Sequence, residues 1–225
     1  VYYFDPKTDY APTTAISSIS WDDPNFPNIE GFGVWAAKCN FTMGPDGKMY
    51  SRMLGGNLVR IDVENARGEN LTNGDLVGTK DGSAYGLVFD PQDENVFYFS
   101  NNDKHCIYKY DLRTKECACW AGQEGKSGYL DGPIGQAMFN KPGQMCVDSE
   151  GNIILTDTEN HCIRKITMST GYVSTLAGKP QNSGYVNGSA EDAQFKKPLG
   201  ICIDNDDVMY IGDSENRAIR RLAVE

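Results

Sequence analysis

The sequence predicts an all-β protein, a β-propeller of four-stranded antiparallel blades, and three observations lead to this fold class. First, the segment "AGQEGKSGYLDGPIGQAMFNKPGQMCVD" (residues 121–148) recurs without a gap in residues 177–204. Second, each repeat unit divides into four short runs rich in β-branched and aromatic residues, separated by Gly, Asp and Asn turns. Third, a period of roughly 40 to 60 residues with four strands per unit is typical of propeller blades.

The four strands of a unit follow in order from the two clearest copies. The first is "GQMCVD" (residues 143–148) or "LGICID" (residues 199–204), and it ends in a turn such as "DSEGN". The second is "IILTD" or "MYIGD", the third "HCIRKIT" or "AIRRLA", and the fourth "YVSTLAG" or "CACWAG". Such strands between turn residues predict an antiparallel meander, with the first strand of each blade lining a central channel.

Weaker copies extend the repeat towards the N-terminus, so we expect a single propeller region over the whole chain. Because the strand total does not divide into four-stranded blades, we expect a ring that has six blades when intact and whose N-terminal part is missing from this sequence. A smaller ring with an irregular first blade is the alternative. The expected units are the end of a preceding blade, three blades and a last three-stranded blade: residues 1–21, about 22–77, 78–122, 123–178 and 179–225.

Composition and charge exclude several classes of function. The 225 residues carry a net charge of −10, and the acidic residues are spread along the chain. Phosphate binding needs clustered Lys and Arg, so we expect no nucleic-acid partner, RNA included. No stretch approaches the roughly 18 apolar residues of a membrane helix, so we expect no membrane-spanning segment.

The chain has 7 Cys, an odd number, so at least one is unpaired within the chain. Four of them occupy matched repeat positions among apolar strand residues, and we expect them to be buried free thiols: Cys106, Cys146, Cys162 and Cys202. Cys117 and Cys119 are expected on opposite faces of one strand, which would be poor geometry for a shared zinc ion.

The segment "GNIILTDTENHCIRKI" (residues 151–166) resembles the NHL repeat, named after an Asn-His-Leu signature. The matching residues here are Asn160, His161, Ile163, Arg164 and Lys165, and in the last blade Asn216, Arg217, Ile219, Arg220 and Arg221. The blade before keeps His105, Ile107 and Lys109 but has Lys104 and Tyr108 in place of Asn and Arg, and the first full blade departs furthest, with Met53 where the others have Asp157 or Asp213.

The repeat also resembles the propeller of exported bacterial surface proteins in which an immunoglobulin-like TIG domain precedes NHL repeats. That resemblance implies an extracytoplasmic location, at the cell surface or in the periplasm. It also implies an immunoglobulin-like domain ahead of this chain.

The signature residues are expected to be structural. Asp157 and Asp213 end second strands before a tight turn, where a carboxylate accepts hydrogen bonds from backbone N–H groups. His105 and His161 occupy equivalent positions on successive blades, so we expect each to pack or hydrogen-bond locally, and the two together to form no common site. The four basic residues of the third strands are expected in exposed or inter-blade salt bridges of little individual weight: Arg164, Lys165, Arg220 and Arg221.

No catalytic motif is present: the sequence has no Gly-x-Ser-x-Gly, no HExxH and no phosphate loop. A calcium ion in the central channel would need carboxylates from several blades to converge there. The candidates Asp90, Asp148 and Asp204 resemble turn residues instead. We therefore expect no cofactor, with calcium as the one possible metal, and the sequence favours a protein without catalytic activity.

Ligand contacts are expected in the long connections between blades and where the chain departs from its repeat. Two connections carry matched pairs, Tyr129 with Asp131 and Tyr185 with Asn187, which would suit a sugar ring or a protein, although packing over the turns is the alternative for the tyrosines. Phe139 and Phe195 are expected to plug the inter-blade core. The departures from the repeat are Trp35, Arg52 and Tyr85, and Arg52 stands where sister blades have Thr156 or Gly212.

The leading hypothesis is a non-catalytic, cell-surface or exported binding module whose ligand is a polysaccharide or a protein. The alternative is a metal-dependent hydrolase or lyase with its site at the central channel of the propeller. The two differ in whether carboxylates meet within metal distance at one mouth of that channel.

Overall fold

The protein is described by a computed structural model. The residues whose structure is described are 2–4, 12–14, 20–21, 41–52, 58–65, 67–71 and 85–223.

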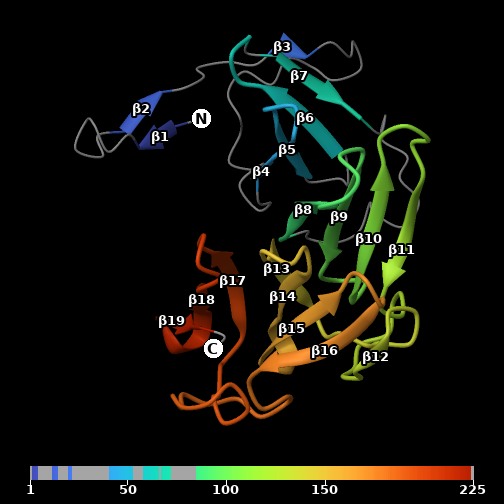
Figure 1. Cartoon of the computed structure of the whole chain (residues 1–225). Coiled ribbons are helices and arrows are strands. Elements are labelled where there is room, and N and C mark those ends of the chain that lie inside the picture. Colours follow the sequence, from blue (N-terminus) through green and yellow to red (C-terminus); the bar gives the residue numbers. More distant parts are fainter. Residues whose placement is uncertain are drawn as a thin grey trace.

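The described strands form a hairpin and four larger sheets arranged as the blades of a propeller (Figure 1). The hairpin pairs β1 (Tyr2–Phe4) with β2 (Pro12–Thr14). The first blade has the order β3-β7-β6-β5-β4, with β3 Ser20–Trp21, β4 Phe41–Met43, β5 Met49–Arg52, β6 Leu58–Asp62 and β7 Arg67–Asn70. Its strands are antiparallel except β3, which lies in the segment expected to end a preceding blade and pairs in parallel with β7.

The other three blades follow one another around the arc, from green to red in Figure 1. The second blade is β8 Leu87–Phe89, β9 Val96–Asn101, β10 Cys106–Asp111 and β11 Cys117–Ala121. The third is β13 Pro142–Val147, β14 Ile153–Asp157, β15 Cys162–Thr167 and β16 Tyr172–Ala177, with the short β12 Gly132–Pro133 beside β16. The last is β17 Pro198–Ile203, β18 Met209–Asp213 and β19 Ala218–Leu222. The predicted all-β propeller is confirmed.

The strand register repeats from blade to blade. In the third blade Ile153 pairs with Ile166 and Asp157 with Cys162. In the last blade Met209 pairs with Leu222, and the second strand β18 again ends on an Asp, Asp213, which pairs with Ala218. Short 3-10 turns, η3 (Thr158–Asn160) and η4 (Ser214–Asn216), link the second and third strands of these blades.

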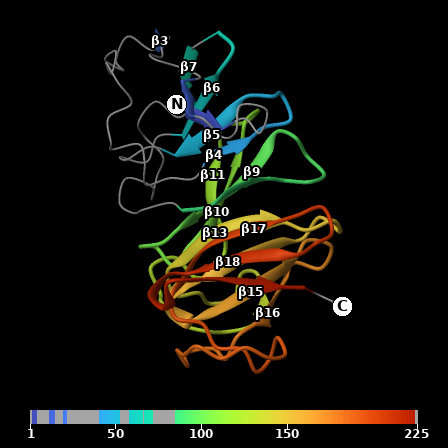
Figure 2. The same cartoon turned by 90° about the vertical axis from the view of Figure 1, so that its left-hand side faces the viewer.

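The apolar core lies between consecutive blades. Ile154 and Ile163 of the third blade pack against Ile201 and Ile211 of the last, and Figure 2 shows these two sheets lying against each other. On the opposite face of the third blade, Ile153 joins the cluster that it shares with the second blade. Blades covered on both faces explain the continuous apolar runs in the strands.

Phe139 and Phe195 fill matched places in this core and are almost fully buried, as predicted. They lie in the connections between blades, which we call the inter-blade segments (residues 122–141 and 178–197). The long connections are therefore anchored by their own aromatic side chains.

Two expectations about the cysteines are wrong. Cys202 is exposed, whereas Cys106 and Cys162 are buried and Cys146 is half-buried. Cys117 and Cys119 pack against the same cluster between the first and second blades, because residues two apart in a strand share a face. All six described cysteines are free thiols.

The inner strands of neighbouring blades approach closely at Gly143 in β13. A Cβ atom there would lie 2.4 Å from Thr156 Oγ1 and 2.9 Å from the carbonyl oxygen of Leu199 in the next blade. The Thr156 hydroxyl donates a hydrogen bond of 3.0 Å to that same carbonyl oxygen. Glycine is thus the residue that lets the last blade dock.

We predict that Gly143→Ala lowers the free energy of unfolding by about 1–3 kcal/mol, the usual cost of overpacking a core. Gly135→Ala is the matched control, because a Cβ atom at Gly135 meets no atom within 4 Å. Urea denaturation of both variants measures the difference. Equal midpoints for the two variants would contradict this account of the blade junction.

Candidate functional site

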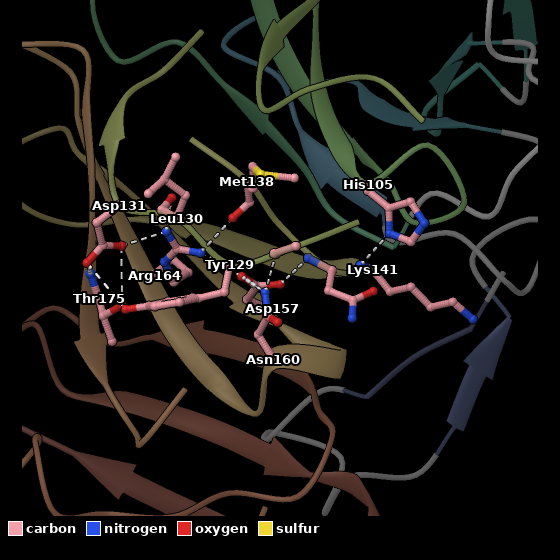
Figure 3. Close-up of polar contacts among 12 residues, drawn as sticks. His105, Tyr129, Leu130, Asp131, Met138, Lys141, Asp157, Asn160, Arg164 and Thr175 are labelled. Carbon is pink, nitrogen blue, oxygen red and sulfur yellow. Dashed lines mark hydrogen bonds and ion pairs between the residues drawn. The ribbon is translucent and has the colours of Figure 1, made fainter. Parts of the chain in front are cut away.

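Arg164 in β15 is hydrogen-bonded through both terminal nitrogens at the junction between the second and third blades (Figure 3). Its guanidinium is 0% exposed. Nη1 donates to Asp157 Oδ2 at 2.7 Å and to the carbonyl oxygen of Met138 at 3.1 Å. Nη2 donates to Asp131 Oδ1 at 2.6 Å and to the carbonyl oxygen of Leu130 at 3.0 Å. One side chain therefore ties β15 to the inter-blade segment.

Asp157 completes the group from the end of β14. Its Oδ1 accepts the backbone N–H of Asn140 at 2.8 Å, and its Oδ2 accepts Asn160 Nδ2 at 2.9 Å as well as Arg164. Asn160 Nδ2 also donates to the carbonyl oxygen of Gly128 at 2.8 Å. We call Arg164, Asp157, Asn160 and Asp131 the arginine latch.

The expectation that Asp157 caps the turn after its strand is corrected by these contacts. The turn Thr158–Asn160 has no side-chain cap hydrogen bond. The carboxylate instead accepts an N–H group 17 residues earlier in the chain. Asp213 does the same with the N–H of Lys196, at 2.7 Å.

Aromatic rings enclose the latch on both sides. The Arg164 guanidinium lies 4.9 Å from the ring centroid of Tyr129 and 5.1 Å from that of Phe139. The Tyr129 hydroxyl bonds to Thr175 Oγ1 at 2.7 Å and donates to Asp131 Oδ2 at 3.4 Å. Tyr129 and Asp131, both predicted to contact a ligand, therefore hold the arginine in place (Figure 3).

The Arg164 guanidinium keeps its charge although it is buried, whereas burial raises the pKa of its partner Asp157 to about 6. Burial by itself lowers the pKa of the Arg164 guanidinium, but the carboxylates of Asp157 and Asp131 more than offset this, so the pKa is raised above its usual value. Of the two expected settings, exposed or inter-blade salt bridges, Arg164 takes the second through Asp131, and both Arg164 and Arg220 are buried, Arg220 being 7% exposed. At the next positions, Lys165 is half-buried and Arg221 is exposed.

A second latch joins the last blade to its inter-blade segment. Arg220 Nη1 donates to Asp213 Oδ2 at 2.9 Å, and Nη2 donates to Asn187 Oδ1 at 2.7 Å. The rings of Tyr185 and Phe195 each lie 4.9 Å from its guanidinium. Asn187 takes the place of Asp131, so this latch has one carboxylate fewer. Tyr185 keeps 60% of its surface exposed.

The junction between the first and second blades is built differently. Tyr108 stands at the position of the latch arginine, and its ring stacks on Phe99 at 5.4 Å. Arg52 of β5 is only 2% exposed, and its guanidinium lies 5.9 Å from the Phe99 ring. The buried guanidinium therefore comes from the preceding blade here, which explains why Arg52 departs from the repeat.

The remaining predicted ligand residues are dispersed. Tyr85 is half-buried before β8, where its backbone N–H donates to Ser100 Oγ at 3.3 Å. Trp35 lies outside the described residues. Beside Tyr129 and Tyr185, the inter-blade segments expose Leu130 and Val186 at equivalent positions, which we failed to single out from the sequence although the repeat aligns them.

The three turn carboxylates are used locally, as predicted. Asp90 Oδ1 accepts the N–H of Gln92 at 2.8 Å, and Asp148 Oδ1 accepts that of Asn152 at 2.7 Å. Asp204 Oδ1 accepts the N–H of Val208 at 2.9 Å. Within the described ranges, no three His, Cys, Asp or Glu side chains are grouped so that they could hold a metal ion. In the same ranges, no helix has the length and apolarity needed to span a bilayer.

The two histidines have matched structural roles in separate junctions, as predicted. His105 Nδ1 accepts the backbone N–H of Lys141 at 3.1 Å, and His161 Nδ1 accepts that of Lys197 at 3.2 Å. Both have left-handed backbones, with φ of 56° and 59°. Burial, together with the Lys141 charge, lowers the pKa of the His105 imidazole.

Comparison with known proteins gives one family match and several relatives. Residues 139–166 match the NHL repeat. The chicken protein NHL repeat-containing protein 2 is 30% identical over 152 residues, 67% of this chain and 19% of that protein. Protein SUPPRESSOR OF QUENCHING 1, chloroplastic, from Arabidopsis thaliana is 28% identical over 173 residues, 73% of this chain and 16% of that protein. The chain thus spans less than a fifth of these relatives.

Three solved structures from Bacteroides have the same fold. An auxiliary nutrient binding protein of Bacteroides thetaiotaomicron superposes with a TM-score of 0.67 at 28% identity, over 81% of this chain and 46% of that one. An auxiliary nutrient binding protein of Bacteroides ovatus gives 0.68 at 26% identity, over 81% and 47%. A protein of unknown function from Bacteroides thetaiotaomicron gives 0.80 at 25% identity, over 100% and 53%. The chain spans about half of each.

We predict that Arg164→Met lowers the free energy of unfolding by about 3–5 kcal/mol, because it leaves the buried Asp157 carboxylate without its counter-charge. Amide hydrogen exchange of Leu130 and Met138 should also become faster. Arg113→Met is the control, since Arg113 pairs with Asp93 and Asp111 on the surface, and it should have a far smaller effect. Similar losses for both variants would show that the latch adds nothing beyond a surface pair.

We predict that protonation of His105 destabilises the fold. Its lowered pKa means that the folded state binds the proton less readily than the unfolded chain, whose pKa is near the usual 6.5. This stabilising contribution is present above that value and is lost as the pH falls through the folded-state pKa. The free energy of unfolding should drop between about pH 7 and pH 5.

The matched variant is His105→Asn, because Asn tolerates the left-handed backbone and retains an acceptor. Its free energy of unfolding should fall less over the same pH range. An NMR titration reports the His105 pKa directly. A His105 pKa above that of a histidine peptide would refute the prediction.

Proposed function

Because the chain is a β-propeller that carries an NHL repeat, we propose that it is a binding module of an exported protein. It recognises a ligand without transforming it, and the ligand is a polysaccharide contacted by the inter-blade segments. The proposal includes, on resemblance alone, an immunoglobulin-like domain ahead of the propeller in the same surface protein.

Two observations outside the site support a role in binding. Solved structures at 26–28% identity are named auxiliary nutrient binding proteins. Both come from Bacteroides, and binding of an external nutrient is consistent with export. Neither name specifies a ligand, so the site itself must supply the chemistry.

The observation that carries the ligand class is the placement of Tyr185. One side of its ring lies over the Arg220 guanidinium, at 4.9 Å, while 60% of the side chain faces solvent. The ring is therefore held before any ligand arrives, so little side-chain entropy is lost on binding. A fixed aromatic face next to polar groups suits a sugar ring, which has apolar C–H faces and a polar edge.

The neighbouring residues extend this surface. Val186 follows Tyr185, and Leu130 occupies the equivalent place one blade earlier; both are exposed. The backbone carbonyl of each accepts a hydrogen bond from a latch arginine, at 2.7 Å and 3.0 Å. The latches therefore hold these loop residues rigidly against the blades. A preorganised binding site requires such rigidity.

The first experiment is binding to a broad glycan array, with and without EDTA. We expect binding to one glycan class that EDTA does not weaken. Tyr185→Ala should weaken it roughly tenfold or more, as for an aromatic anchor. Tyr210→Ala is the matched control, because Tyr210 is also exposed but lies in β18, outside the inter-blade segments, and it should leave binding unchanged.

The other outcomes each decide against part of the proposal. Binding or turnover that needs a metal ion would favour the hydrolase or lyase alternative. Glycan binding that is insensitive to Tyr185→Ala would refute the site. Absence of binding to every glycan would overturn the polysaccharide and leave a protein as the ligand of this module.

A further inference from the structure

A pocket of about 260 Å³ lies between the third and last blades. It opens beside the turns that link first and second strands, and none of its lining residues belongs to the inter-blade segments. Its apolar lining comes from Ile154, Leu176 and Met209. It is thus separate from the surface around Tyr185.

The pocket exists because the chain departs from its own repeat at two positions. In the preceding junction, Tyr98 stands at the position of Ile154 and Trp120 at that of Leu176. The Tyr98 and Trp120 rings lie 4.2 Å apart and pack against the core between the second and third blades. Two smaller aliphatic side chains stand here in place of that aromatic pair, and the pocket lies above them.

Position 154 is the exception among the described second strands. The equivalent residues are Tyr50, Tyr98 and Tyr210, and the hydroxyl of each donates to an Asp in the turn that precedes its strand, Asp46, Asp90 or Asp204. Because the fold is built three times with Tyr, it does not require Ile154. A residue that the fold does not require, and that opens a pocket, is a candidate for function.

The rim of the pocket is negatively charged. Asp148 has no Tyr hydroxyl to bind and pairs instead with Lys165 Nζ at 2.9 Å, and Glu150 Oε2 lies 3.4 Å from the same nitrogen. Asp207 reaches across from the last blade, where its Oδ1 accepts the backbone N–H of Ser149 at 2.9 Å. Three carboxylates and one ammonium thus line the pocket, so its rim has an excess of negative charge.

The Asp148–Lys165 pair at this rim keeps both of its charges near neutral pH. Burial by itself lowers the pKa of the Lys165 ammonium, but hydrogen bonding and the charge of Asp148 more than offset this, so the pKa is raised. Burial by itself raises the pKa of Asp148, but the Asn152 N–H and Lys165 reverse this, so the pKa is lowered. Lys165 neutralises one carboxylate, and the excess negative charge attracts a cation.

We propose that this pocket binds a small organic cation that carries an aromatic ring. The ring lies in the pocket against the half-buried Leu176, above Ile154 and Met209, which are 0% and 2% exposed and form the packed floor. The cationic group lies at the rim beside Asp207 and Glu150. A ligand of this size in a pocket below the usual range for drug-sized molecules should have a dissociation constant on the order of 0.1–1 mM.

The probe is phenethylamine, with phenethyl alcohol and hydrocinnamate as its neutral and anionic analogues. Titration of the whole chain, followed by NMR shifts or calorimetry, should give saturable binding of the amine. The alcohol should bind about tenfold more weakly or worse, and the anion should not bind, because only the amine gains from the negative rim. Equal binding of amine and alcohol would overturn the proposal.

Two variants locate the binding. The double variant Ile154→Tyr with Leu176→Trp restores the ring pair of the preceding junction, so it should fold and lose amine binding. Asp207→Asn should weaken amine binding about tenfold, and Asn suits its left-handed backbone, where φ is 58°. Asp206→Asn is the matched control, because it removes one exposed charge from the same turn and should leave binding unchanged.

Each result bears on the pocket itself. Retained amine binding by a folded double variant would refute it, as would equal effects of Asp207→Asn and Asp206→Asn. If the double variant does not fold, the analogue series and the Asp207 and Asp206 pair still decide. Tyr185→Ala should leave amine binding intact, so failure of the glycan proposal and failure of this one are distinguishable.

Discussion

The burial of a guanidinium between consecutive blades is the constraint on which much of this structure depends. Apolar faces such as those of Ile154 and Ile201 attract each other in many relative positions, since the hydrophobic effect has no direction. Arg164 is different, because a buried charge needs hydrogen-bond acceptors at defined positions. The acceptors of its two terminal nitrogens come from β14 and from Leu130, Asp131 and Met138 of the inter-blade segment, so they hold the segment in one position against the blade.

The latch also determines which residues remain available for function. Asp157, Asp131 and Tyr129 are the residue types that build catalytic or binding sites, yet their polar atoms are bonded within the latch. The histidines are used in the same way, as acceptors for backbone N–H groups. Function must therefore rely on what this scaffold leaves exposed, such as Tyr185, or leaves open, such as the pocket beside Ile154.

The blades show how a repeat tolerates variation once each junction is satisfied. The second latch replaces a carboxylate with Asn187 and still binds its arginine. The first junction draws its guanidinium from the opposite blade, through Arg52. The junction of the third and last blades gives up an aromatic pair and opens a pocket. The feature that the three junctions share is a buried guanidinium beside an aromatic ring.

The sequence by itself determined the strands, their order within each blade and the equivalence of positions 56 residues apart, because these follow from local periodicity and turn residues. The shared face of Cys117 and Cys119 also follows from strand geometry, although we predicted the opposite. The burial of Arg164 became clear only from the three-dimensional structure, because its partner Asp131 lies 33 residues away in the chain and no local pattern pairs the two. It likewise decided that Ile163 is buried while Ile219, at the same repeat position, is 75% exposed. Burial depends on which blade packs against a given face of the sheet. Equivalent residues of two repeats can therefore have different exposure, because the repeat sequence does not specify the neighbouring blade.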